Sequence, residues 1–333
     1  MAIEFTREVQ RASFYSPLED FEHVDAEVEV REDPLTGRQS RIAPGSFLAP
    51  DSYDIEEVVG DSEGCFFCPD SVEEVTPTYD DFVGEDRGSE GEATSFPNLN
   101  PYGAYSNVVA LTEDHFRPID EFEPAIFEDG IRLALRYVAA VRDHDERARF
   151  ASVNMNFLRP AGSSIVHPHL QTLVDDRATN HQRTLLEASR EYHDEHDSSY
   201  WADLRGREED GERHVADTGD VRWLAPFAPK HHRHLVGVAG EHGFPDPEGD
   251  LPADLGAGLV PVLQSYAAAG LNSFNVALYL ADDPTMPPVL DIVARSVFDE
   301  YYWSDSPFFT VLHDEGVVDV APETYAAEAR EQF

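Results

Sequence analysis

The same succession of secondary-structure patterns occurs twice along the 333 residues of the chain. Each occurrence has strand patterns, then a helix with apolar residues at helical spacing, then two strands joined by a loop that contains Pro or Gly. The helix and its two following strands cover residues 124–143, 150–156 and 170–174 in the first half, and 251–269, 273–280 and 289–293 in the second. This order suits an antiparallel sheet with a helix on one face. We therefore predict an α+β fold of two tandem repeats, one in residues 1–180 and the other in residues 181–333.

Two histidines lie two residues apart near the end of the first repeat, and a glutamine follows them. The alternation of polar and apolar residues over 170–174 predicts a strand. A period of two would place His167, His169 and Gln171 on one face of that strand. The preceding small residues, 160–164, allow a phosphate to approach backbone N–H groups closely. An imidazole beside such a loop favours phosphoryl or nucleotidyl transfer with a histidine nucleophile, although histidine pairs also occur by chance, in protein cores and in metal sites.

The only two cysteines, Cys65 and Cys68, form a Cys-x-x-Cys motif. Such a motif is redox-active, binds a metal, or is simply a pair of buried thiols. A structural zinc site would need two further ligands, most plausibly histidines. Two cysteines are too few for a disulfide scaffold, so the fold must be held by its core.

Acidic residues far outnumber basic ones, at 66 Asp and Glu against 24 Lys and Arg, which gives a formal net charge of −42. The hydrophobic content of 41% is that of a globular protein, so the acidity does not indicate disorder. A carboxylate-rich surface suits a high-salt cytoplasm, where ions screen the repulsion. We therefore predict a halophilic, cytoplasmic protein. The charge argues against nucleic acid and anionic membranes as partners, and no apolar stretch is long enough to span a membrane.

His167-Pro168-His169-Leu170-Gln171 resembles the His-Pro-His-x-Gln signature of the galactose-1-phosphate uridylyltransferases, the nucleotidyltransferase branch of the histidine-triad superfamily. The resemblance implies two histidine-triad repeats that form a pseudo-dimer within the chain. It implies that His169 attacks the α-phosphorus of a nucleoside diphosphate sugar, with its other ring nitrogen fixed by a backbone carbonyl. Gln171 would donate a hydrogen bond to a nonbridging phosphate oxygen. Because a neutral amide cannot protonate a leaving group, it favours a transferase over a hydrolase.

The resemblance assigns further residues to a metal and to substrate. The expected ligands of a structural zinc, with no position open for catalysis, are Cys65, Cys68, His115 and His167. The expected substrate contacts are Arg31, Asn98, Asn156, Gly162, Ser163 and Ser164. The segments around Arg31 and Asn98 are, by themselves, equally compatible with ordinary turns.

The second repeat lacks the histidine pair, so one chain carries one reaction centre. Some family members hold a second metal with a glutamate and a pair of histidines. Glu187 could be that glutamate here, but residues 290–294 stand where the histidines would be and contain none, so we do not expect this site. The basic cluster 230–234 would alternate between the two faces of a strand, and we expect no joint function for it. Residues 70–95 are acidic and rich in Gly, Ser and Thr, which predicts a mobile surface insertion.

The implied reaction moves a nucleoside monophosphate, in the first place UMP, between a nucleoside diphosphate sugar and a sugar-1-phosphate, as in galactose metabolism. A phosphorylase of ADP-sugars or dinucleoside polyphosphates would use the same chemistry at His169. A catalytically silent nucleotide-binding regulator and a zinc-stabilised interaction protein are further alternatives. His313-Asp314 stands where the family has Tyr-Glu, which leaves the sugar unspecified. Family members are commonly homodimers whose partner completes the sugar pocket, so we expect a homodimer.

Overall fold

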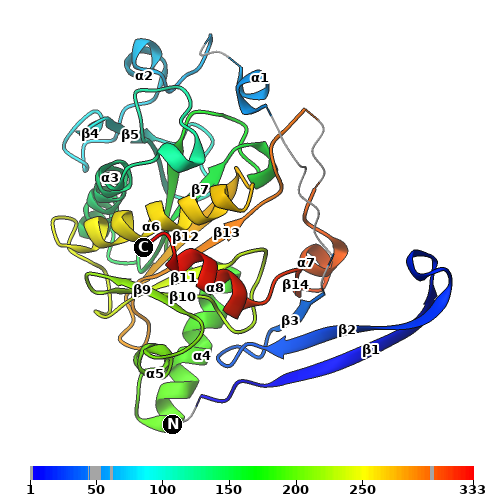
Figure 1. The fold of residues 1–333 in the computed structure, drawn as a ribbon. Helices are drawn as coiled ribbons and strands as arrows, with labels where there is room; N and C mark the ends of the chain where they lie inside the picture. Colours follow the sequence, from blue (N-terminus) through cyan, green and yellow to red (C-terminus); the bar gives the residue numbers. More distant parts are fainter. Residues whose placement is uncertain (1–2, 44, 46–53, 61–62, 301–303) are drawn as a thin grey trace.

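A ten-stranded sheet forms the body of the protein (Figure 1). The computed structural model describes residues 3–43, 45, 54–60, 63–300 and 304–333. The first half of the chain contributes β4 (Gly88–Glu90), β5 (Ala93–Pro97), β6 (Tyr105–Ala110), β7 (Phe150–Phe157) and β8 (His169–Asp175). The second half contributes β9 (His214–Thr218), β10 (Val221–Leu224), β11 (Leu235–Ala239), β12 (Phe274–Ala281) and β13 (Val289–Ala294).

The two halves of this sheet have the same strand order when each is followed outward from the centre. The order is β7, β8, β6, β5, β4 on one side and β12, β13, β11, β10, β9 on the other. A helix precedes the central strand in each half, α3 (Pro124–His144) before β7 and α6 (Leu251–Ala268) before β12. The halves meet at the antiparallel β7–β12 pair, where Phe157 lies opposite Phe274. The predicted α+β fold of two tandem repeats in a pseudo-dimer is thus confirmed.

The helices α3 and α6 pack on one face of the sheet and against each other, and they enclose the main core. The apolar spacing predicts the buried side chains of α3, which include Ile126, Leu133, Tyr137 and Val141. Gly256 allows the two helices to approach closely, because a β-carbon at this position would lie 2.5 Å from the carbonyl oxygen of Pro124. The helices therefore fix the two halves of the sheet as one layer.

Two further helices, α4 (Asn180–His196) and α5 (Tyr200–Glu208), cover the opposite face of the second half. Leu186 and Trp201 of these helices pack in a second core with Val238 and Val289 of the sheet. The boundary expected at residue 180 coincides with the first residue of α4. The division of the chain into two domains there stays a prediction.

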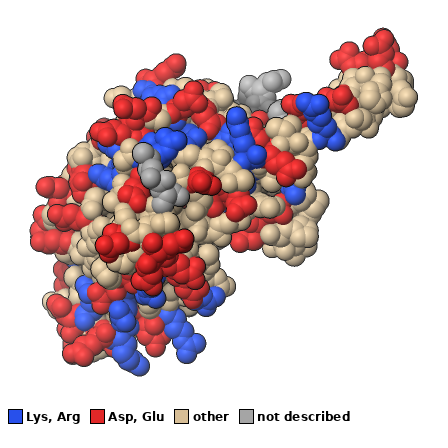
Figure 2. Space-filling view, turned by 90° about the horizontal axis from the view of Figure 1, so that it is seen from below, with Lys and Arg blue, Asp and Glu red and all other residues tan. Residues whose placement is uncertain are grey.

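A four-stranded sheet joins both ends of the chain in the order β1 (Arg7–Ser16), β2 (Glu22–Glu32), β3 (Gln39–Ile42) and β14 (Gly316–Val318). The strands β1 and β2 form an arm that projects from the body (Figures 1 and 2). The outer part of the arm exposes large apolar side chains, namely Phe14, Tyr15, Leu18 and Phe21. A two-stranded hairpin is marginally stable in water by itself, so the arm is suited to contact another surface.

The remaining described helices are short. They are α1 (Ile55–Val59), α2 (Pro69–Val75), α7 (Phe308–Leu312), α8 (Pro322–Arg330) and the 3-10 turns Pro17–Glu19, Ile119–Glu121 and Arg159–Ala161. No helix in the described ranges is long and apolar enough to cross a membrane. Figure 2 shows acidic side chains spread over one face of the molecule, with basic side chains between them.

The prediction of a mobile insertion over residues 70–95 is wrong. Most of α2 lies in this segment, and β4 and β5 extend the edge of the large sheet by pairing next to β6. Val72 and Ala93 are buried. A few apolar residues among many acidic ones are enough to order the segment, because an existing sheet edge supplies their partners.

Candidate active site

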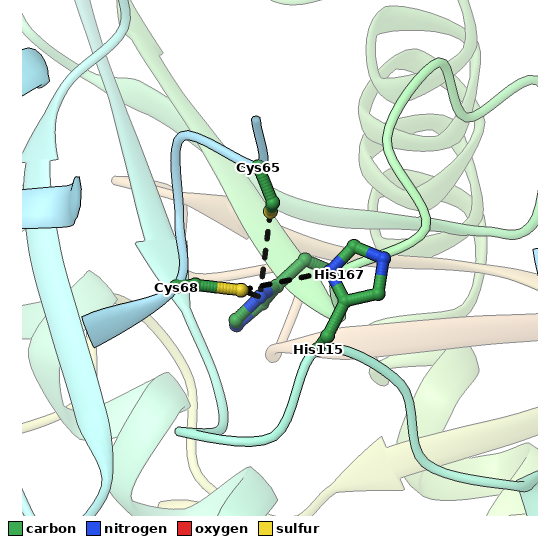
Figure 3. A group of neighbouring side chains, drawn as sticks. All are labelled: Cys65, Cys68, His115 and His167. Carbon is green, nitrogen blue, oxygen red and sulfur yellow. Dashed lines mark hydrogen bonds between the residues drawn. The ribbon is translucent and has the colours of Figure 1, made fainter. Parts of the chain in front are cut away.

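Two cysteines and two histidines from distant parts of the chain converge at one point (Figure 3), namely Cys65, Cys68, His115 and His167. Their candidate ligand atoms all lie within 4.8 Å of one another. The Sγ atom of Cys68 is 3.6 Å from Nδ1 of both His115 and His167, and Sγ of Cys65 is 3.8 Å from Nδ1 of His167. A tetrahedral zinc ion with ordinary bond lengths holds sulfur and nitrogen roughly 3.6 Å apart. The predicted ligands thus form a group that can hold a metal ion.

The backbone and a hydrogen bond orient this group. Cys68 is the N-cap residue directly before α2, and His115 lies in the loop after β6. The Nε2 atom of His167 lies 2.7 Å from the carbonyl oxygen of Thr112. Because a carbonyl only accepts, Nε2 carries the proton and Nδ1 presents its lone pair to the cysteines. Burial lowers the pKa of His167 to about 4, which keeps the ring in the neutral form that binds metals.

His167 does not share a strand face with His169 and Gln171, so this part of the prediction is wrong. The strand β8 begins at His169, and His167 lies in a bend before it. The alternation that governs side chains in a strand therefore does not reach back to His167. Its ring turns instead toward the cysteines, while His169 and Gln171 point together to the face opposite α3.

His169 is a buried histidine with a defined proton position. The side chain is 7% exposed, and its Nδ1 lies 2.8 Å from the carbonyl oxygen of His167. Nδ1 is therefore the protonated nitrogen, and Nε2 keeps its lone pair. Burial also lowers the pKa of His169, so the ring is uncharged at neutral pH. A neutral imidazole with an available Nε2 is the form that acts as a nucleophile.

Phe67 connects the cysteine motif to His169, a contact that the sequence analysis missed. Its ring centroid lies 5.2 Å from that of His169 and 6.1 Å from that of His167, edge to face in both cases. Phe67 also packs on Phe96 at 5.3 Å. The residue between the two cysteines thus forms part of the wall around His169, and its place inside Cys-x-x-Cys was the available signal.

Gln171 follows His169 on the same face of β8, and its side chain is half-buried. Its backbone carbonyl accepts a hydrogen bond of 3.2 Å from the side-chain amide of Asn154 on β7. As alternate residues of β8, Gln171 and His169 project from the same face of the strand. The structure brings together the two residues predicted to be catalytic.

Asn156 lies at the centre of the sheet, where the two halves meet. Its Oδ1 accepts a hydrogen bond of 2.7 Å from Nδ2 of Asn275, which also donates to the carbonyl of Ala161 at 2.8 Å. Arg295 donates to Oδ1 of Asn275 at 2.6 Å and is held by Asp305. Asn275 and Arg295 were not predicted, although Asn275 stands on the strand that repeats β7. The network ties the loop before His169 to the second half.

The predicted phosphate loop reaches the sheet just before His169. Gly162 is exposed and has a φ of +91°, a conformation that favours glycine, and its N–H donates to the carbonyl of Arg159 at 2.9 Å. Ser164 is also exposed, whereas the hydroxyl of Ser163 is buried and donates to the carbonyl of Ile165 at 2.6 Å. The loop therefore has the open, small-residue character that an approaching phosphate needs. The individual contacts stay predictions.

Arg31 is a strand residue rather than a turn residue, since β2 continues to Glu32. Its guanidinium is 3% exposed and donates to Glu323 at 2.8 and 3.0 Å and to Glu29. It also lies over the ring of Phe227 at 4.6 Å. The described fold therefore places Arg31 in a buried ion pair, and its contact with substrate stays a prediction.

Asn98 follows β5 and has an unused donor. Its Oδ1 accepts from the backbone of Asn100 at 2.9 Å. Within the described ranges, nothing accepts a hydrogen bond from its buried Nδ2. Buried amide donors normally have a partner, so a bound ligand is a suitable acceptor. The predicted contact with base and ribose stays a prediction.

No family model matches the chain. An uncharacterized protein of Archaeoglobus fulgidus is 34% identical to it over 331 residues, which cover 99% of this chain and 98% of that protein. The chain and this archaeal protein belong to one family. Among solved structures, an ADP-glucose phosphorylase from Arabidopsis thaliana with bound ADP-glucose matches 91% of this chain and 99% of its own, with a TM-score of 0.70 and 19% identity.

A uridylyltransferase structure matches 91% of this chain and 98% of its own, with a TM-score of 0.64 and 18% identity. The protein has the uridylyltransferase fold, as the resemblance of the histidine motif implies. Within this fold, His167 of the group that can hold a metal ion lies directly before the strand that carries His169 and Gln171.

Proposed function

We propose that the protein is a nucleotidyltransferase that moves a nucleoside monophosphate, in the first place UMP, between a nucleoside diphosphate sugar and a sugar-1-phosphate in the cytoplasm. The observation that supports this most is the hydrogen bond of 2.8 Å from Nδ1 of His169 to the carbonyl of His167. It leaves Nε2 as the nucleophilic atom of a neutral ring. A silent nucleotide-binding regulator would have no need of this arrangement.

The first step forms a bond between Nε2 of His169 and the α-phosphorus. The bond from this phosphorus to the bridging oxygen breaks, and the sugar-1-phosphate leaves with the electron pair. The ring gains positive charge, which the carbonyl of His167 stabilises through the N–H it accepts. In the second step an acceptor phosphate oxygen attacks the phosphorus, and the electrons of the P–N bond return to Nε2. Atoms and charge therefore balance over the cycle without a redox partner.

Gln171 steadies the charge on phosphorus in both steps. We propose that its amide N–H donates to a nonbridging oxygen, from its position two residues after His169 on the same strand face. An amide supplies no proton to activate water or to help a poor leaving group depart. The nucleotidyl-histidine then persists until an acceptor with its own phosphate arrives, which favours transfer over hydrolysis.

We propose zinc as the metal of the Cys2His2 group, with a structural role. Two thiolates and two imidazoles complete a tetrahedral shell and leave no position for substrate. The residues Cys65 and Cys68 would anchor the segment before α2, and His167 would fix the bend from which His169 projects. The metal thereby places the carbonyl that orients the nucleophile.

The phosphates would lie between the loop before β8 and the central Asn156. We assign phosphate contacts to Gly162, Ser163 and Ser164, with the hydroxyl of Ser164 and the backbone of Gly162 as the exposed groups. Asn98 would meet the base or ribose with its unpaired amide. Arg31 would have to exchange Glu323 for a phosphate to take part.

We infer a homodimer in which the arm of β1 and β2 packs on the partner. The exposed fractions of Leu18 and Phe21 at its tip are 91% and 69%, which a solvated hairpin would not favour. Replacement of Leu18 and Phe21 by serine is expected to convert the dimer to monomer in analytical ultracentrifugation. The control variant replaces Ser13 and Ser16 of the same arm by alanine. A wild-type protein that is monomeric would refute the inference.

A second candidate is a phosphorylase that transfers the nucleotide of an ADP-sugar to inorganic phosphate. It is favoured by the TM-score of 0.70 to a phosphorylase that holds ADP-glucose, against 0.64 to a uridylyltransferase. The chemistry at His169 is the same in both candidates. The two candidates differ in the base of the nucleotide that His169 holds. They also differ in the acceptor that takes this nucleotide from His169.

The decisive experiment is mass spectrometry of the protein after separate incubation with UDP-glucose and ADP-glucose, at neutral pH because phosphoramidates are acid-labile. We expect the mass of UMP or of AMP to appear on the chain and to disappear when galactose-1-phosphate or inorganic phosphate, respectively, is added. The label should be absent from His169→Ala and present in His193→Ala, an exposed histidine of α4. Folded wild-type protein that takes up neither nucleotide would overturn the proposed function.

A further inference from the structure

The second half of the protein contains a hollow over the face of the sheet that α4 and α5 cover. Its cavity volume is about 80 Å³, and it is open to solvent at its mouth. Most of its wall is apolar, and it includes four residues of the Phe, Tyr or Trp type: Phe5, Tyr200, Trp201 and Phe227. Flat, apolar walls of this kind accept a ring.

Polar side chains gather where this hollow opens. Thr36, Arg38, His181 and Lys230 line both the hollow and a wider groove that runs toward residues 310–316. Arg38 is held at this neck by a hydrogen bond to the carbonyl of Ala228. The neck therefore presents a guanidinium and an ammonium at the entrance of a mainly apolar pocket, whose wall also includes Asp33, Glu208 and Arg213.

Lys230 is the only lysine of the chain, in which every other basic residue is arginine. Its ammonium donates to Oδ2 of Asp291 and to Nε2 of His181, the latter at 2.6 Å. Its backbone N–H donates to Nδ1 of His234, so Nε2 of His234 carries the proton that binds Oδ1 of Asp291 at 3.0 Å. Both oxygens of Asp291 are thus occupied, while an ammonium has a third N–H to offer.

Asp291 is ionised in this arrangement. Burial opposes its charge, but Lys230 and His234 outweigh burial and hold the pKa of Asp291 well below its usual range. The carboxylate therefore fixes the position of the ammonium rather than competing for a ligand. The basic cluster 230–234 precedes β11 instead of lying on it, so the prediction that its side chains alternate along a strand is wrong. Lys230 and His234 converge on one aspartate because they lie in a turn.

The hollow occupies the face that corresponds to the His169 face of the first half. β13 holds the place in the second half that β8 holds in the first. Leu170 and Leu290 both point into the core beneath α3 and α6, so their neighbours His169 and Asp291 both point to the opposite face. The second half thus retains a pocket over this face, with a fixed cation and no nucleophile.

We propose that this hollow is a second, non-catalytic binding site for a phosphate monoester that carries a ring, either a nucleoside monophosphate or a sugar phosphate. The ring lies against Tyr200, Trp201 and Phe227, and the phosphate meets Lys230 and Arg38 at the neck. No bond forms or breaks there. The site is independent of the transfer at His169. Binding there requires the folded protein but not the transfer reaction.

Trp201 supplies a direct reporter, because it forms part of the wall. AMP, UMP, glucose 1-phosphate and inorganic phosphate are titrated separately while tryptophan emission is recorded. We expect a saturable change with at least one monoester and a binding constant at least tenfold weaker for inorganic phosphate. The preferred monoester identifies the source of the ligand. The change should persist in His169→Ala, which separates this site from the catalytic one, and vanish in Trp201→Phe.

Two variants test the assigned contacts. Lys230→Gln removes the ammonium, and Leu204→Trp fills the hollow from α5 without altering its charges. Each should weaken binding of the preferred monoester at least tenfold, whereas Arg177→Gln, a charge loss at an exposed site, should leave it unchanged. Circular dichroism verifies that each variant is folded. Absence of any Trp201 response in wild-type protein, or equal binding by folded Leu204→Trp, would overturn the proposal.

Discussion

The Nδ1 atom of His169 lies 2.8 Å from the carbonyl oxygen of His167, whose own ring belongs to the group of two cysteines and two histidines. One residue thus contributes its side chain to the cysteine–histidine group and its backbone carbonyl to His169. The ring of His167 is held from the other side by the carbonyl of Thr112. The position of the bend between the two histidines is therefore determined by the group that includes Cys68.

Loss of the metal is expected to slow the reaction although no ligand touches substrate. Cys68→Ser should remove the bound metal, lower the melting temperature and reduce the rate of His169 labelling at least tenfold, because the carbonyl of His167 is no longer fixed. Metal analysis, thermal unfolding and the labelling assay measure the three effects. Glu73→Gln, an exposed change on the same helix, is the control. Metal loss with an unchanged labelling rate would show that the metal group does not position His169.

Replacement of Gln171 should separate stabilisation of phosphorus from nucleophilic attack. Gln171→Ala is expected to reduce the labelling rate roughly 10² to 10³-fold, the usual effect of losing one oxyanion donor. Gln171→His should add a proton donor and raise the rate at which water removes the nucleotide. Release of free nucleotide without acceptor measures the second effect. Gln332→Ala at the exposed C-terminus is the control, and a hydrolysis rate unaltered by histidine would contradict the assigned role.

Glu323 should contribute stability that depends on pH. Burial opposes its charge, but Arg31 and Arg213 outweigh burial and lower the pKa of Glu323 from 4.5 to about 2. Its folded-state pKa lies below the unfolded value, so this contribution is complete above about pH 4.5 and is lost as pH falls toward 2. Glu323→Gln should lower the free energy of unfolding at pH 7 by roughly 1–3 kcal/mol, because it leaves buried guanidinium donors unpaired.

The matched control for Glu323 is Glu328→Gln on the same helix, whose ion pair with Arg233 is more exposed and should cost less than about 1 kcal/mol. Denaturant unfolding at pH 7 and pH 3 measures both variants. The difference between wild-type and Glu323→Gln should shrink at pH 3. Arg31→Met, assayed in parallel, shows whether Arg31 also affects the Michaelis constant, as its predicted phosphate contact requires.

Salt should stabilise the fold. At a net charge of −42 the folded chain repels itself, and the Debye length falls from about 10 Å at 0.1 M salt to about 3 Å at 1 M. We expect the melting temperature to rise between these concentrations of KCl and to continue rising less steeply above them. An uncharged osmolyte at the same osmolality is the control. A melting temperature that is constant or falls in KCl would contradict the halophilic prediction.

Much of the fold could be predicted because local pattern and tertiary structure agree. The apolar spacing of residues 124–143 identifies α3, and the alternation of residues 170–174 identifies β8, since each pattern fits only one way of burying its apolar side chains. The grouping of Cys65, Cys68, His115 and His167 was likewise predicted from motif and resemblance. Their chemical types are specific enough to identify the group before its geometry is known.

The errors arose where distant segments supply the partners. The segment 70–95 is ordered because β6 offers it a sheet edge, and Arg31 is buried because Glu323, far away in sequence, meets it. Residues 230–234 form a turn whose Lys230 and His234 meet at Asp291. None of these partners lies within the window from which a local pattern is read.

The sequence by itself determined which residues can do chemistry, since two cysteines, a histidine pair and a glutamine have properties that do not depend on their neighbours. It also determined the repeat, because periodicity follows from local backbone geometry. Only the tertiary structure decided which histidine turns to the cysteines and which nitrogen of His169 keeps its lone pair. Those outcomes depend on hydrogen bonds and contacts between segments that the fold alone brings within a few ångströms.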